Sequence, residues 1–125
     1  MKSLSLLVVS LSLLVVSLSL LVGATDPSIV VIGEVSDTQC AFNVHSSDGS
    51  HGSMIKTGTL GQNAEQCTRT CVRMGGKYVL VDTATNKLYR LANPDRVQDF
   101  AARQVRVRGV VDSRGVLSII TIESR

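Results

Sequence analysis

Five residues of the types that bind soft metals or form disulfides lie in one stretch of this chain. They are three cysteines and two histidines: Cys40, His45, His51, Cys67 and Cys71. Thiolate and imidazole groups bind zinc and copper, and paired cysteines form disulfides. A single disulfide would leave one of the three thiols over, whereas a site of three cysteines and one histidine would leave none. The first question is therefore what these cysteines do.

The last two cysteines, Cys67 and Cys71, lie in a segment with the pattern of a short helix. Asn63 suits the N-cap, Gln66 suits the third helical position, and a glycine pair follows the segment. A four-residue separation places both cysteines on one face, with Cβ atoms about 5–6 Å apart. Because a disulfide needs Cβ atoms about 3.8 Å apart, we expect no bridge between these two. Either could pair with Cys40, or both could face a shared ligand.

We expect a structural disulfide from Cys40 to Cys71, or to Cys67. The alternative is a metal site for zinc or copper made of Cys40, Cys67, Cys71 and a histidine. His45 is the better candidate than His51, because it lies nearer to Cys40 in the sequence. A third alternative is a redox-active thiol, whose pKa would be lowered by two arginines on the predicted helix.

The N-terminal segment has the composition of an export signal. Lys2 is followed by an apolar run over residues 4–22 and by small residues that end at Ala24. We expect a signal peptide over residues 1–24 and one mature domain over residues 25–125, placed in the periplasm or secreted. The alternative is an uncleaved membrane anchor formed by residues 4–22. Disulfides form and persist in exported proteins, which favours the disulfide for the cysteines.

The rest of the chain predicts a small, mainly β domain. Alternating and β-branched stretches indicate five strands, over residues 28–36, 77–83, 87–91, 104–111 and 116–122. A short helix with Asn93 as its cap and Pro94 at its first position falls between the third and fourth strands. This order is typical of a five-stranded, OB-like, partly open barrel, and a five-strand meander with a surface helix is the alternative. The alternation predicts these inward residues: Val79, Val81, Val105, Val107, Val110 and Ile119.

Several short motifs resemble a family of small exported bacterial domains of uncharacterised function. They are Gly33-x-x-x-Asp37-x-x-Cys40-Ala41, Cys67-x-x-x-Cys71-Val72-x-x-Gly75, Tyr78-Val79-Leu80-Val81-Asp82 and Val105-x-Val107-x-Gly109-x-x-Asp112. The resemblance implies export and an OB-like barrel with a cysteine-bearing helix after the first strand. It implies no established activity.

Composition argues against two classes of function. The net charge of +3, the absence of Trp and the scarcity of aromatic residues do not favour nucleic-acid binding. The aspartates Asp37, Asp82 and Asp112 follow predicted strands, where turns commonly place Asp, and no catalytic set accompanies them.

We therefore expect an exported, disulfide-stabilised binding module of the cell envelope. It is predicted not to be an enzyme and to carry no cofactor, and its partner would be a protein or a small ligand there. It would contact a membrane only through an uncleaved N-terminal segment. The alternative is a periplasmic metal-binding or thiol-redox protein that uses the three cysteines and a histidine.

Overall fold

The computed structural model describes residues 27–42 and 60–125 of the chain. Five strands are present: β1 Ile29–Asp37, β2 Tyr78–Asp82, β3 Leu88–Leu91, β4 Gln104–Val111 and β5 Val116–Ser124. The helices are α2 Thr38–Ala41, α4 Ala64–Arg73 and the 3₁₀ helix η1 Pro94–Phe100. The predicted N-terminal signal, His45 and His51 lie outside the described residues, and what was expected of them stays a prediction.

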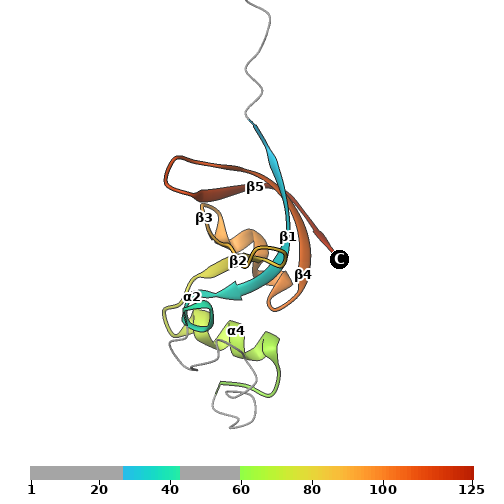
Figure 1. Ribbon diagram of the computed structural model, residues 1–125. Coiled ribbons are helices and arrows are strands. Elements are labelled where there is room, and N and C mark those ends of the chain that lie inside the picture. The colour runs from blue at the N-terminus through green and yellow to red at the C-terminus, as the bar shows by residue number, and fades with distance from the viewer. Residues whose placement is uncertain (1–26, 43–59) are drawn as a thin grey trace, which may run out of the picture.

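The five strands close into a ring in the order β1-β2-β3-β5-β4 (Figure 1). The β3–β5 pair is parallel and every other neighbouring pair is antiparallel. A meander would leave β3 and β5 apart, so the alternative architecture is wrong. The protein has the predicted mainly β fold, a small OB-like barrel with η1 between the third and fourth strands.

The first strand joins two sides of the barrel. Residues 29–34 of β1 pair with β4, and residues 33–37 pair with β2. Gly33 belongs to both ladders, and a side chain there would collide with the backbone oxygen of Val81. Gly33 therefore lies where β1 passes from one neighbour to the other.

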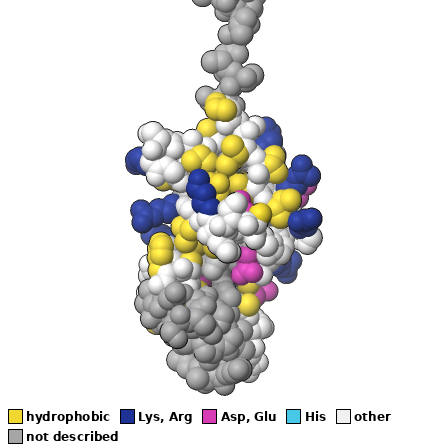
Figure 2. All heavy atoms as spheres, viewed as in Figure 1, with side chains coloured by type: hydrophobic (Ala, Val, Ile, Leu, Met, Phe, Trp, Pro, Cys, Tyr) yellow, Lys and Arg dark blue, Asp and Glu magenta, His cyan; other side chains and the backbone are white. Residues whose placement is uncertain are grey.

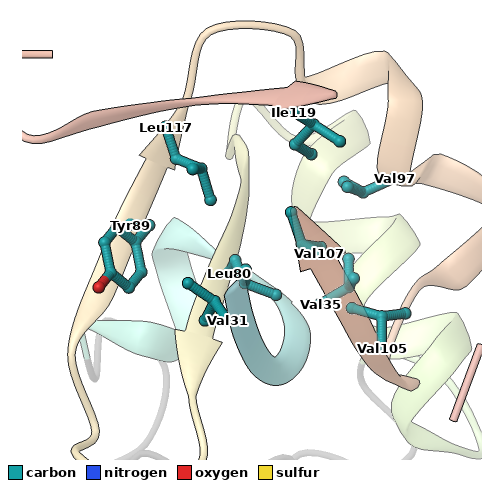
Figure 3. Close-up of a cluster of buried hydrophobic side chains, with 9 residues drawn as sticks. All are labelled: Val31, Val35, Leu80, Tyr89, Val97, Val105, Val107, Leu117 and Ile119. Carbon is teal, nitrogen blue, oxygen red and sulfur yellow. The ribbon is translucent and has the colours of Figure 1, made fainter. Parts of the chain in front are cut away.

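Valine, leucine and isoleucine side chains fill the barrel, together with Tyr89 (Figure 3). Of the predicted inward residues, four are buried: Val79, Val105, Val107 and Ile119. Val81 and Val110 are only half-buried. Leu80 lies in the core cluster and Val79 does not, so the inward phase of β2 is that of Leu80. On β4, strict alternation carries Gly109 inward, and the ladder shifts register between Arg108 and Gly109.

The short helix η1 closes one end of the core. Its Val97 is fully buried in the core cluster. Asn93 does not cap this helix as predicted. Its side chain instead accepts a hydrogen bond from the Ile119 amide at 3.0 Å and donates one to the Ile119 carbonyl oxygen at 3.1 Å. Asn93 therefore fixes the connection before η1 to β5, because its amide satisfies both backbone groups of one residue.

On the face of the molecule drawn in Figure 2, the Lys and Arg side chains lie in separate groups. Within residues 27–42 and 60–125, no helix is both long and apolar enough to cross a membrane. The apolar run over residues 4–22 lies outside that part of the chain.

Candidate functional site

Helix α4 carries two of the three cysteines and is closed at both ends. The side-chain oxygen of Asn63 accepts a hydrogen bond from the amide of Gln66 at 3.0 Å, as the sequence predicts. At the other end Gly75 has a φ of +105°, and the amide of Gly76 donates to the carbonyl of Cys71 at 2.9 Å. The helix therefore ends in a glycine-terminated Schellman motif, and Cys71 takes part in its closing hydrogen bond.

Helix α2 is a single turn that carries Cys40, and the sequence pattern does not predict it. Asp37 is its N-cap, because one carboxylate oxygen accepts hydrogen bonds from the amides of Gln39 and Cys40, each at 2.9 Å. Two further bonds join α2 to the chain leaving α4. The Thr38 amide donates to the Lys77 carbonyl at 2.9 Å, and the Lys77 amide donates to the Thr38 hydroxyl at 3.0 Å. The signal for this turn is the spacing Asp37-x-x-Cys40, which is an N-cap followed by its third helical residue.

The two helices lie together beside the end of β1 and bring three sulfurs to one place (Figure 1). The Cys40 Sγ lies 3.9 Å from the Cys67 Sγ and 3.9 Å from the Cys71 Sγ. All three sulfurs lie within 4.8 Å of one another. Cys67 and Cys71 are fully buried, Cys40 is 5% exposed, and Leu60 completes the cluster. All three cysteines predicted as site residues therefore meet, as free thiols in this structure. The pairing of Cys40 with Cys71 or Cys67 stays a prediction.

The surroundings of two of the sulfurs raise the pKa of their thiols. Burial raises the pKa of Cys40, and the negative charge of Asp37 raises it further. Burial, followed by the same charge, raises the pKa of Cys71 from 9.0 to about 12. The arginines expected to lower a thiol pKa have other partners. Arg69 is ion-paired with Glu65 at 3.0 Å, and Arg73 donates to the Thr70 hydroxyl at 2.8 Å.

Two buried polar atoms beside the cysteines lack a hydrogen-bond partner in the structure. They are the second carboxylate oxygen of Asp37 and the hydroxyl of Thr68, and both residues are fully buried. A buried carboxylate oxygen without a partner is costly in free energy, and such groups often mark a place where an ion or water binds. The position of Asp37 after a strand predicts a turn residue, and its burial is not evident from the sequence.

Two sides of the sulfur triangle have the length found in metal sites. Sulfur atoms bound to one ion at about 2.3 Å are about 3.8 Å apart in tetrahedral geometry and about 4.0 Å apart in a trigonal plane. The two separations of 3.9 Å from Cys40 fall between these values, and the third pair lies within 4.8 Å. A disulfide, by contrast, needs sulfurs about 2.05 Å apart. Two of the sulfurs would have to move toward each other, and the third would remain a free thiol.

Fold and site together define a small OB-like barrel protein with a buried cluster of three cysteines. Residues 71–125 match the model of a family described as protein of unknown function (DUF5818). The matched part begins at Cys71 and spans β2 to β5, so it includes one of the three cysteines. No curated protein and no solved structure matches the chain.

Proposed function

We propose that the protein is an exported, non-enzymatic binding domain that holds a thiophilic metal ion between Cys40, Cys67 and Cys71. The observation that carries this proposal is the placement of the Cys40 sulfur 3.9 Å from both helix sulfurs. Zinc and Cu(I) are the ions that sulfur donors of this kind select. A histidine from the segment after Cys40 would be a suitable fourth ligand for zinc.

The location of the domain is part of the proposal. The signal-like residues 1–24 and the resemblance to small exported bacterial domains support a place in the periplasm or outside the cell. A mature chain that begins at Thr25 would confirm export with cleavage. A chain in the envelope fraction that still begins at Met1 would support the uncleaved anchor over residues 4–22.

A structural disulfide is the second candidate for the cysteines. The same 3.9 Å separations leave Cys40 equally near to Cys71 and Cys67, so either bond could form after a small movement of α2. An oxidising compartment favours such a bond. In that case the domain would be a disulfide-stabilised module whose ligand is a protein or small molecule of the envelope.

A thiol-redox function has less support. Redox-active cysteines have lowered pKa values and reach solvent. Here burial raises the pKa of Cys40 and Cys71, and Cys67 is fully buried. These properties are those of protected thiols, which a metal can still deprotonate because it binds the thiolate directly.

The test combines thiol counting with metal analysis on protein purified from the envelope. We expect one zinc or copper ion per chain, and three thiols that react with an alkylating agent only after denaturation with a chelator. The variants Cys40→Ser, Cys67→Ser and Cys71→Ser should each lose the ion. Met74→Ser is the control, since it removes an exposed sulfur at the end of the same helix.

The result also separates the two candidates. Two thiols that become reactive only after reduction, with no metal in the protein, would establish the disulfide and refute the metal site. Retention of the ion by all three cysteine variants would place it elsewhere in the chain.

A further inference from the structure

Asp37 combines a buried negative charge with a place beside the sulfurs. Among residues 27–42 and 60–125 it is the one acidic side chain that is buried, with no exposed surface. An isolated buried charge is strongly unfavourable unless an opposite charge or hydrogen bonds compensate it.

The position of the Asp37 carboxylate is fixed by its role as the cap of α2. One oxygen is held by the amides of Gln39 and Cys40, each at 2.9 Å. The other oxygen is buried and has no partner in the structure. The electrostatic effect of the carboxylate reaches both Cys40 and Cys71, which lie on different helices. The carboxylate therefore lies at the start of the helix that carries Cys40, and it cannot turn to solvent without releasing the amides that it caps.

We infer that Asp37 shifts the preference of the cysteine site toward divalent and away from monovalent metal ions, so that the ratio of zinc to Cu(I) affinity is higher than three thiolates alone would give. This inference rests on the metal site proposed above. Asp37 acts as a specificity-determining residue through its charge and through its hold on Cys40.

The reason is a difference of one unit of charge. Either ion forms three bonds to sulfur and releases the same three protons, and no electron is transferred. The zinc complex of three thiolates has a charge of −1, whereas the Cu(I) complex has a charge of −2. A fixed negative charge near the site repels the second complex more. In a medium of effective dielectric constant near 20, one unit of charge at about 6–10 Å changes an affinity on the order of tenfold to hundredfold.

The variant Asp37→Asn tests this inference. Its side-chain oxygen can keep both cap hydrogen bonds, since Asn is as good an N-cap as Asp, and only the charge is lost. The dissociation constants of zinc and Cu(I) are measured by competition with chromophoric chelators. The ratio of the two affinities should shift toward Cu(I) by about tenfold or more. Cd²⁺ and Ag⁺, a second pair of soft ions that differ in charge, should shift in the same direction.

Asp82→Asn is the matched control. One oxygen of Asp82 also accepts hydrogen bonds from two backbone amides, those of Ala84 and Thr85 at 2.8 and 3.1 Å. This carboxylate is only half-buried and lies at the far end of β2 from the cysteines. The same chemical change there should leave the ratio of affinities unchanged.

The ratio stays informative if Asp37→Asn is unfolded without metal. Both ions would then bear the same folding cost, which cancels when their affinities are compared. An unchanged ratio in a variant that still binds both ions would overturn the role of Asp37 and leave the metal site intact. Failure of the unaltered protein to bind either ion would refute the site itself, and this inference with it.

Discussion

The thiols of Cys40 and Cys71 hold their protons more tightly than exposed cysteines do, and burial is the main cause. A group whose pKa is raised on folding stabilises the folded protein at pH values below the pKa of the unfolded chain. Above that value, the unfolded chain loses the proton while the folded protein retains it. The contribution of the thiol to stability is then lost progressively.

We therefore predict that the reduced, metal-free protein loses stability as the pH rises from about 9 toward 12, the range over which the pKa of Cys71 is raised. The slope should reach up to about 1.4 kcal/mol per pH unit for each such thiol. Urea unfolding at pH 8 and pH 10.5, with reductant and chelator, measures it. Cys71→Ser should show a smaller fall, and an equal fall in both proteins would show that other groups cause it.

The residues of the site were only partly predictable. Cysteine is rare enough for the three positions to be evident in the sequence. The equal distances from Cys40 to its two partners were not predictable, because they depend on how α2 sits against α4. The burial of Asp37 was also not predictable, since an aspartate that ends a strand is usually a solvated turn residue. Only the folded structure, in which Asp37 has no exposed surface, shows that it is enclosed.

Helix α4 positions two of the sulfurs, so its ends bear on the site. Asn63 was predicted as its cap because Asn accepts hydrogen bonds from free amides at a helix start. Gln66 is the third residue of the helix, as predicted. Its side-chain oxygen accepts a hydrogen bond from the amide of Gln62, at 2.9 Å, rather than from the amide of the cap residue Asn63. Helix α2 was not predicted, because a single turn of four residues shows no helical periodicity.

We predict that Asn63→Ala lowers the free energy of unfolding by about 1 kcal/mol, because the amide of Gln66 then loses its acceptor. Chemical denaturation of the metal-free protein measures the change. Metal affinity should also fall, since the start of the helix frays near Cys67. Asp95→Ala is a comparison at the first turn of η1, where no side-chain cap is present, and its effect should be smaller. A loss at position 63 no larger than at position 95 would contradict the role of the cap.

The barrel as a whole follows from alternation along its strands, which is why its strands were predictable. Val105 and Val107 point inward while Arg106 and Arg108 point outward, as the period of two requires. The predicted inward residues were wrong where apolar side chains do not alternate with polar ones. The sequence of β2 is apolar on both faces, so its phase was misjudged. On β4 the inward positions are Val105, Val107 and Gly109, so Val110 is out of phase with the core.

We predict that Val107→Asp abolishes cooperative unfolding, because it places an unpaired charge in the fully buried core. Circular dichroism during a thermal melt provides the measurement. Arg108→Asp introduces the same residue at the adjacent, exposed position of β4 and should melt near the unaltered protein. A normal melt for Val107→Asp would mean that β4 presents its other face to the core.

The cysteine segment, residues 38–77, connects the end of β1 to the start of β2. Asp37, the last residue of β1, is paired directly with Tyr78, the first residue of β2. The β1–β2 ladder thus ends at this pair, so Thr38 and Lys77 continue from it at neighbouring points. Replacement of residues 38–77 by Asn-Gly, which favours a two-residue hairpin turn, should leave a folded barrel that binds no metal. Circular dichroism shows whether the barrel folds, and metal analysis shows whether it binds an ion. A shortened chain that fails to fold would contradict the expectation.

That junction has an evolutionary consequence. A segment whose two ends meet at one rung of a ladder can be inserted, lengthened or lost with little change in the strands that carry it, because longer loops add little closure entropy. Related chains can therefore share the barrel and differ in whether they bear the cysteines. Homologues should then be grouped by the presence of this insertion before any function is transferred among them.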